Sequence, residues 1–305
     1  MTPAHPAAPY TSVAILGPGL LGGSIALAIR EKMPGCRLRI WARDHAKLTR
    51  QCALHPALTG AHLPADPAEC ARGAELVILA TPIGAFASLC ERILPALSPR
   101  SLVTDVGSVK NSVHAGIGQW LTARGIPFIG SHPMAGGEKQ GMEHARANLL
   151  HRANIALTNP HAVAEDQVER LSAFWHTLGG TPILFGAQEH DETVARISHV
   201  PHLLAALCAR GAAHGSTADH LRQLASSGFR DTSRVSSGDP AMWAGIVLAN
   251  AGAIRSILRS CVSDLETLCH LLDTEQPDAA AIQTWLREAK DAREGILSSP
   301  PPPTA

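Results

Sequence analysis

The chain has 305 residues, enough for one large domain or two ordinary ones, and 45% of them are apolar against 17% charged. This composition supports a buried core and excludes disorder for the bulk of the chain. Lys plus Arg equals Asp plus Glu at 26 each, so no global field attracts nucleic acid or an anionic membrane. We expect a small-molecule partner, no nucleic acid and no membrane.

Seven cysteines are scattered along the chain, and none is spaced as CxxC. Their odd number and spacing argue against a disulfide framework and a structural zinc site, and they favour a reducing compartment. The first residues show neither a charged leader nor an apolar stretch, and glycines and a proline interrupt the apolar region 13–29. These features predict a soluble cytoplasmic protein.

Short apolar runs of strand length alternate with longer amphipathic segments from residue 12 to about residue 185. The alternation predicts βαβ units and a doubly wound, mostly parallel sheet, and hence the α/β class. Residues 12–186 should form a Rossmann-like dinucleotide-binding domain behind an N-terminal extension, 1–11. The expected strands are 12–17, 38–42, 75–80, 101–106, 127–131, 154–158 and 182–185.

Beyond Gly186 the strand patterns stop, and Leu, Ile, Val and Ala recur at helical spacing. Residues 187–297 should form an all-helical substrate domain, whose surplus of Ala and Leu predicts a homodimer through its helices. Residues 298–305, SSPPPPTA, predict a disordered tail. The expected helical segments are 187–214, 217–227, 240–272 and 277–294, with loops at Gly215, Ser226 to Gly228 and Ser236 to Pro240.

The glycine pattern Gly17-x-Gly19-x-x-Gly22 directly follows the first expected strand and opens an amphipathic helix. In this context the pattern indicates a dinucleotide-binding loop. Gly17 allows the tight turn, Gly19 lets a pyrophosphate approach the backbone, and Gly22 lets helix and strand pack closely. The helix start at Leu20 and Leu21 offers unpaired N–H groups to the phosphates.

The end of the second expected strand should decide which dinucleotide binds. Arg43 falls where the strand ends, about 20 residues beyond the glycines, and suits the 2′-phosphate of NADP. Asp44 is one step further, where it suits either a ribose hydroxyl of NAD or the cap of the next helix. We predict NADP, with NAD as the alternative, because a one-residue slip reverses the choice. Thr81 and Pro82, after the third strand, are further expected cofactor contacts.

Four motifs follow behind GPGLLGG: DVGSVK (105–110), GSHPMAG (130–136), SHVPH (198–202) and GFRDTSR (228–234). In this order they closely resemble the prephenate/arogenate dehydrogenase family of tyrosine biosynthesis, over about residues 12–290. The resemblance implies a cyclohexadiene substrate with a 4-hydroxyl and a ring carboxylate, either prephenate or arogenate. Hydride then leaves the hydroxyl carbon for the nicotinamide, and loss of CO₂ aromatises the ring.

His132 and Ser108 are the expected catalytic residues. Each comes just past the end of an expected strand, on the face of the sheet that carries the nicotinamide. Histidine is the natural base for a hydroxyl proton near neutral pH, so His132 is the candidate base. The resemblance makes Ser108 a partner of the substrate hydroxyl or of His132, and we also expect it to cap the next helix.

The resemblance also places Arg234, His202, Gly228 and Glu138 at the substrate. Arg234 matches a carboxylate-binding arginine, whose planar fork of donors suits that group. Glu138 matches an acidic residue near the pocket mouth. His202 favours prephenate over arogenate, because an extra donor suits a pyruvyl side chain.

The sequence offers three further candidates: His199, His190 and Asp191. His199 and His202 lie three apart, but no third ligand has a readable spacing, so we expect no metal. The resemblance leaves His199 as a structural neighbour of the pocket. The pair His190-Asp191 matches a family pair, although a helix-start role explains Asp191 equally well.

Two other functions compete. A β-hydroxyacid dehydrogenase typically uses a lysine on the first long helix of its helical domain, and residues 187–214 contain no lysine. A nucleotide-sensing protein without catalysis would be expected to lack His132 or Ser108, and both are present.

Overall fold

The computed structural model describes residues 8–137, 139–213, 218–273 and 277–298. Most of the predicted N-terminal extension and nearly all of the predicted tail therefore lie outside the described residues. The chain forms two compact units that divide after Ile254, and each is described by itself.

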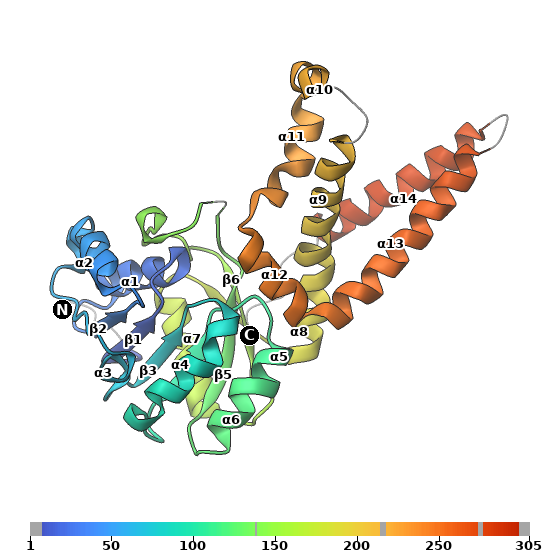
Figure 1. Cartoon of the computed structure of the whole chain (residues 1–305). Coiled ribbons are helices and arrows are strands. Elements are labelled where there is room, and N and C mark those ends of the chain that lie inside the picture. The colour runs from blue at the N-terminus through green and yellow to red at the C-terminus, as the bar shows by residue number, and fades with distance from the viewer. Residues whose placement is uncertain (1–7, 138, 214–217, 274–276, 299–305) are drawn as a thin grey trace, which may run out of the picture. The chain divides into compact units, whose positions relative to one another are not determined.

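A seven-stranded sheet forms the framework of the first unit, in the order β2-β1-β3-β4-β5-β6-β7 (Figure 1). Neighbouring strands run parallel except β5 and β6, which are antiparallel. All seven predicted strands and the mostly parallel sheet are thus confirmed. The strands are β1 (Ser12–Leu16), β2 (Arg37–Trp41), β3 (Leu76–Leu79), β4 (Leu102–Asp105), β5 (Phe128–Pro133), β6 (Asn154–Thr158) and β7 (Thr181–Phe185).

β5 is longer than predicted. His132 pairs with Ala156 of β6, and Pro133 pairs with Ile155. His132 therefore lies within the strand, and the expectation that it follows the strand end is wrong. The antiparallel partner causes the difference, because it continues the ladder past the point where the parallel neighbour β4 stops.

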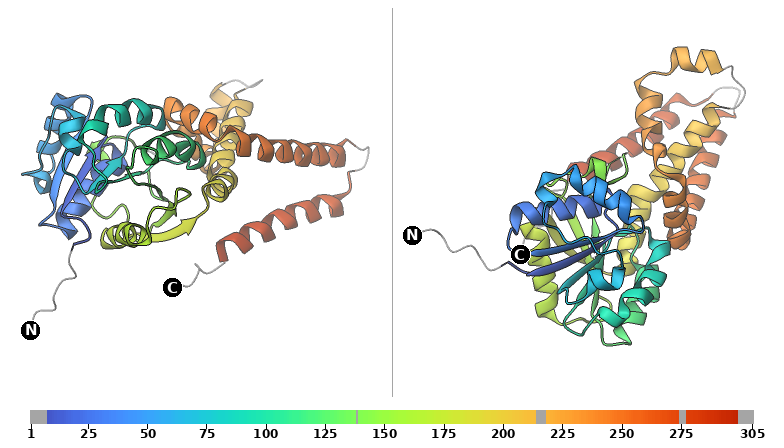
Figure 2. Two further views of the ribbon diagram at one scale, coloured as in Figure 1. Left: turned by 90° about the horizontal axis from the view of Figure 1, so that it is seen from below. Right: turned by 60° about the vertical axis from the view of Figure 1, so that its left-hand side comes forward.

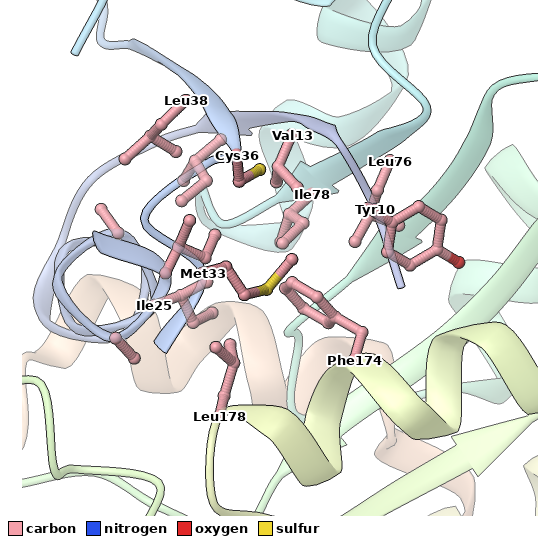
Figure 3. Packing of buried hydrophobic residues seen from close by; sticks show 14 of the residues in the cluster. Tyr10, Val13, Ile25, Met33, Cys36, Leu38, Leu76, Ile78, Phe174 and Leu178 are labelled. Atoms are coloured by element: carbon pink, nitrogen blue, oxygen red, sulfur yellow. The ribbon is translucent and has the colours of Figure 1, made fainter. Parts of the chain in front are cut away.

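Helices cover both faces of the sheet, as Figure 2 shows. Strand residues alternate between the two faces, so that Val13 and Ile15 pack on one side and Ala14 and Leu16 on the other. One face packs on α1 (Leu20–Lys32) and α7 (Glu165–Thr177), where Phe174 fills the space beneath Val13 and Ile78 (Figure 3). The other face packs on α3 (Pro67–Ala71), α4 (Phe86–Ile93) and the helical run 111–122.

That run starts as α5 (Asn111–Val113), widens into a π-helical turn (His114–Gly118) and ends as α6 (Gln119–Thr122). α2 (His45–Ala53) follows β2. Short 3₁₀ turns lie at Pro56–Leu58, Ile83–Ala85, Leu94–Ala96, Met142–His144 and Arg234–Ser237.

The described residues beyond Gly186 are helical, as predicted. No single helix among the described residues is both long and apolar enough to cross a membrane; only the broken pair α12 and α13, taken together, passes, by length and composition alone. The helices are α8 (Ala187–Val194), a π-helical turn (Ala195–His199), α9 (Val200–Ala212), α10 (Ala218–Leu224), α11 (Ser227–Ser233), α12 (Pro240–Ala249), α13 (Ala251–Leu272) and α14 (Ala279–Ser298).

Two predicted boundaries are wrong. Ser227 and Gly228, expected in a loop, form the first turn of α11. The segment 240–272 is two helices, because the chain breaks at Asn250. The Asn250 side chain is buried and donates to the Asp191 carbonyl at 2.8 Å, a contact that holds the break in place.

The close approach of α1 to β1 gives a stability prediction. A Cβ at position 22 would lie 2.4 Å from the Gly17 carbonyl oxygen, whereas a Cβ at position 19 would meet nothing within 4 Å. We expect Gly22→Ala to lower the free energy of unfolding by about 1–3 kcal/mol, because α1 must move away from the strand. The control, Gly19→Ala, should stay within about 0.5 kcal/mol of wild type. Urea denaturation measures both, and equal stability of the two variants would contradict the packing argument.

Candidate active site

The loop between β1 and α1 has the geometry of a dinucleotide cradle. Gly17 has φ +101°, a left-handed conformation that favours glycine, and a Cβ there would lie 2.8 Å from the Ala80 carbonyl oxygen. Open space lies beside Gly19, and Leu20 is the first residue of α1. The backbone therefore has the shape that the glycine pattern predicts, and it fits a nicotinamide dinucleotide.

A buried hydroxyl beside this loop also fits a bound cofactor. The methyl carbon of Thr81 would lie 2.7 Å from a Cβ at Gly17, so this side chain borders the glycine turn. Its Oγ1 atom is buried and has no hydrogen-bond partner within the described part of the chain. Pro82, the next residue, is exposed. A ligand with a polar group at this point would satisfy Thr81.

Arg43 and Asp44, the two charged residues after β2, have different surroundings. Asp44 is the N-cap of α2, and its carboxylate accepts from the Lys47 N–H at 2.8 Å. The predicted capping role of Asp44 is therefore confirmed. Arg43 is exposed two residues after the strand ends at Trp41.

A cavity of about 390 Å³ brings the two expected catalytic residues together. Ser108 reaches it from the segment after β4, and His132 from the end of β5. His199 reaches it from the π-helical turn. The other lining residues are Pro133, Met134, Ala135, Gly136, Gly137, Ser198, Met242, Trp243 and Ile246.

A second cavity, of about 460 Å³, adjoins the first and shares Gly136 and Gly137 with it. Leu20 at the start of α1 lines this cavity, and so does Arg234. Its remaining lining residues are all basic: Lys139, His144 and Arg146. Arg234 therefore lines the same cavity as Leu20, the first residue after the expected cofactor loop, in a setting that suits anions.

Two other predicted substrate contacts, His202 and Gly228, line neither cavity. His202 does not line either cavity but stacks behind the Trp243 ring, with centroids 3.5 Å apart and an interplanar angle of 13°. Gly228 is exposed in α11 and lines neither cavity. Glu138 lies outside the described residues. In the described part of the chain, no group of three or more His, Cys, Asp or Glu side chains could hold a metal ion.

A fully buried ion pair supports the site, and neither partner is expected from the sequence patterns. Lys110 Nζ pairs with Asp105 and also donates to the Ser131 carbonyl at 2.7 Å, next to His132. Burial raises the pKa of Asp105 and lowers that of Lys110, and their mutual attraction opposes both shifts. The available signal was an Asp and a Lys five residues apart in DVGSVK, directly after an apolar strand.

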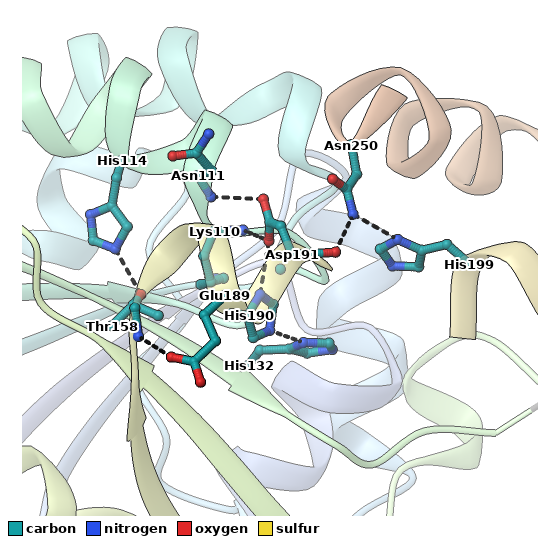
Figure 4. Close-up of polar contacts among 12 residues, drawn as sticks. Lys110, Asn111, His114, His132, Thr158, Glu189, His190, Asp191, His199 and Asn250 are labelled. Atoms are coloured by element: carbon teal, nitrogen blue, oxygen red, sulfur yellow. Dashed lines mark hydrogen bonds and ion pairs between the residues drawn. The ribbon is translucent and has the colours of Figure 1, made fainter. Parts of the chain in front are cut away.

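The helix after this motif is not capped by Ser108. It begins at Asn111, and its first N–H groups end on a distant carboxylate (Figure 4). Asp191 Oδ1 accepts from the Lys110 N–H at 2.7 Å, and Oδ2 accepts from the Asn111 N–H at 2.9 Å. The expected N-cap role of Ser108 is therefore wrong. Asp191 does serve a helix start, but that of α5 and not that of its own helix, α8.

His132 is joined to the same carboxylate through a second histidine. Its Nδ1 lies 2.8 Å from His190 Nε2, and His190 Nδ1 lies 2.8 Å from Asp191 Oδ1. All three side chains are buried. Burial lowers the pKa of His132 well below its ordinary value, and the charge of Lys110 adds to this effect. His132 is therefore neutral near pH 7 and available as a base.

Comparison with known proteins places this geometry in a family. Residues 25–184 match the family model for the prephenate dehydrogenase nucleotide-binding domain, and residues 186–296 match that for the prephenate dehydrogenase dimerization domain. The chain belongs to the prephenate dehydrogenase family. It is thus an oxidoreductase with a nicotinamide cofactor, and the resemblance found in its motifs is confirmed.

Two relatives of this prephenate dehydrogenase family member match most of its length. Prephenate dehydrogenase of Bacillus subtilis is 31% identical over 291 residues, which cover 93% of this chain and 76% of the relative. Cyclohexadienyl dehydrogenase of Zymomonas mobilis is 29% identical over 88% of this chain and 91% of its own length.

Two solved structures share the fold over nearly the whole chain. The structure of A. aeolicus prephenate dehydrogenase with hydroxyphenyl propionate and NAD⁺ matches with a TM-score of 0.83 and 25% identity, over 94% of this chain and 98% of that chain. Synechocystis arogenate dehydrogenase matches with a TM-score of 0.77 and 29% identity, over 93% of this chain and 99% of that chain. Both confirm the Rossmann-like domain followed by helices.

The buried histidines predict how stability depends on pH. Burial lowers the pKa of His114 to about 3 and that of His199 to about 4, whereas both titrate near 6.5 when unfolded. Below pH 6.5 the unfolded state therefore binds more protons, and the free energy of unfolding falls as pH falls. We expect Tm to decline from pH 6.5 to 4 in calorimetry.

The variant His114→Gln provides the control, because its amide can replace the imidazole that contacts Thr158 Oγ1 at 2.7 Å. As pH falls, its free energy of unfolding should fall less steeply than that of wild type. The two slopes should differ by up to about 1.4 kcal/mol per pH unit, the contribution of one titrating group. Identical slopes for the two proteins would mean that His114 does not titrate on unfolding.

Proposed function

We propose that this chain oxidises and decarboxylates prephenate to 4-hydroxyphenylpyruvate, with NADP as the hydride acceptor. The observation that carries the proposal is a buried neutral histidine, His132, that lines one cavity together with Ser108. The adjoining cavity is lined by Leu20, the first residue of α1. Arogenate is the alternative substrate. It has the same ring, and relatives that carry both names match the chain.

The residues of the cavity suit the proton transfers of this reaction. His132 Nε2 takes the proton of the 4-hydroxyl, and Ser108 hydrogen-bonds the same oxygen. The nicotinamide, when bound, supplies the acceptor for the hydride that leaves the hydroxyl carbon. The ring carboxylate then leaves as CO₂, and the electron pair of the broken C–C bond aromatises the ring. His132 returns its proton to the resulting phenolate oxygen, so the reaction releases no net proton.

Arg234 is proposed to bind a substrate carboxylate. It lines the cavity that adjoins that of His132, and its planar donors suit a carboxylate better than an ammonium does. His202 is proposed to act through Trp243, the indole that it supports and that lines the substrate cavity. For Gly228 and Glu138, only the family resemblance supports a substrate contact.

NADP is proposed over NAD on the geometry after β2. The carboxylate of Asp44 is engaged by the start of α2, which leaves the exposed Arg43 as the charged group beside the expected ribose position. Gly17, Gly19, Gly22, Leu20, Leu21, Thr81 and Pro82 are the proposed contacts for the rest of the dinucleotide.

A homodimer through residues 187–297 is also proposed. Support comes from the dimerization-domain match and from exposed apolar side chains on three helices: Leu207 (58% exposed), Leu248 (77%) and Val262 (53%). The match to the nucleotide-binding domain ends at residue 184 and the match to the dimerization domain begins at residue 186, which supports the domain boundary proposed at Gly186. Free cysteines support the proposed reducing cytoplasm.

Crossed steady-state kinetics test the reaction. Wild-type enzyme should turn over prephenate with a higher kcat/KM than arogenate. His132→Asn should lower kcat by about 10²- to 10⁴-fold at an unchanged KM for the dinucleotide, because it removes the base and keeps a polar side chain. The control, His176→Asn, replaces an exposed histidine on α7 and should match wild type. Activity of His132→Asn within a few-fold of wild type would exclude His132 as the base.

The choice of dinucleotide is tested at Arg43. Arg43→Asp removes the proposed partner of the 2′-phosphate and supplies an acceptor for a ribose hydroxyl. We expect the ratio of kcat/KM for NADP over NAD to fall at least tenfold, by roughly the value of one charge-assisted contact. The control Arg50→Asp makes the same charge change later on α2 and should leave the ratio unchanged. An unchanged ratio in both variants would assign the choice to another group.

A further inference from the structure

We propose that His190 and Asp191 are positioning residues that fix the tautomer of His132, so that its Nε2 lone pair faces the substrate cavity. The inference rests on the proposed function, in which His132 is the base. It assigns a role to a histidine that lines neither of the two cavities.

The order of donors and acceptors follows from the carboxylate. Backbone N–H groups only donate, so the two contacts from Lys110 and Asn111 require Asp191 to accept on both oxygens. An ionised carboxylate has no proton to give, and the His190 Nδ1 contact must therefore be an N–H that donates to Asp191 Oδ1. The proposal assigns the neutral imidazole to His190, and with the proton on Nδ1 its lone pair is then on Nε2.

The same reasoning extends one step to His132. Because His190 Nε2 is an acceptor, His132 Nδ1 must hold the hydrogen that joins them at 2.8 Å. Neutral His132 then has its lone pair on Nε2, the remaining ring nitrogen. The rings meet edge-on, with centroids 5.0 Å apart and an interplanar angle of 71°.

The arrangement is rigid and also suits the protonated state. His132, His190 and Asp191 are 9%, 3% and 4% exposed, so water competes little for their hydrogen bonds. Asn250 holds the Asp191 carbonyl at 2.8 Å, which fixes the peptide as well as the side chain. When His132 takes a proton on Nε2, its Nδ1–H still donates to His190, and the negative charge of Asp191 lies one ring away.

Two isosteric variants of His190 separate positioning from packing. In His190→Gln the amide oxygen replaces Nε2 and can accept from His132, whereas in His190→Asn the amide reaches Asp191 but not His132. We expect His190→Asn to lower kcat by about 10- to 100-fold, with a KM for prephenate within about threefold of wild type. His190→Gln should keep most of the wild-type kcat. Melting temperatures are measured on both variants.

A spectroscopic readout is independent of turnover. In the ¹⁵N spectrum of histidine-labelled protein, identified by comparison with His132→Asn, the His132 ring should show a protonated Nδ1 and a bare Nε2 near neutral pH. The His190→Gln variant should keep this pattern, and His190→Asn should show a mixture of tautomers. The control Glu192→Gln, an exposed position on the same helix, should change neither kcat nor the spectrum.

The outcomes distinguish this inference from the proposed function. A wild-type spectrum with the proton on Nε2, or equal kcat in both His190 variants, would overturn the positioning role. Loss of kcat that follows Tm in both variants would assign His190 to packing alone. If His132→Asn keeps its activity, the proposed function fails instead, while the tautomer in the spectrum still reports on the contacts.

Discussion

The backbone N–H groups that open the helical run 111–122 have no carbonyl to bond, and a buried helix start needs an acceptor. Asp191 supplies it from α8, 80 positions further along the chain than Asn111. This contact joins the segment after β4 to the first helix beyond the sheet. The same carboxylate accepts from His190, so the requirement of a helix start and the orientation of an imidazole are met by one side chain. Loss of either contact would disturb the other.

His132, the proposed base, is held by a different constraint. Catalytic groups at the ends of parallel strands usually stand on loops, but His132 lies in a ladder with the antiparallel strand β6. Beneath it, Lys110 and Asp105 join β4 to the Ser131 peptide without any exposure to solvent. A buried pair of this kind contributes little net stability, but removing one partner costs about 3–5 kcal/mol because the other charge stays buried and uncompensated. Together these contacts explain how a strand residue stays aligned with a cavity.

Features set by nearby residues could be read from the sequence. The strands follow from apolar runs, the glycine turn from three residues of one motif, and the cap of α2 from Asp44, three residues before its donor. The N-cap role expected of Ser108 is wrong because a carboxylate far along the chain serves the same helix start. The contact between His132 and His190 spans 58 positions, and no local pattern encodes it. The break at Asn250 likewise depends on a remote carbonyl.

The π-helical turn at Ala195–His199 joins α8 to α9 and shifts the helical periodicity of the sequence between them. A π turn accommodates an extra residue in a continuing helix, and each residue turns an α-helix by about 100°. Side chains before the turn, such as His190, therefore belong to a different angular register from those after it, such as His202. One continuous helical segment therefore makes two different contacts: His190 contacts His132 before the π turn, and His202 stacks on Trp243 after it. Because the wide turn absorbs one residue, removing a single residue from it would restore regular α-helical hydrogen bonding and leave the faces of α9 in place.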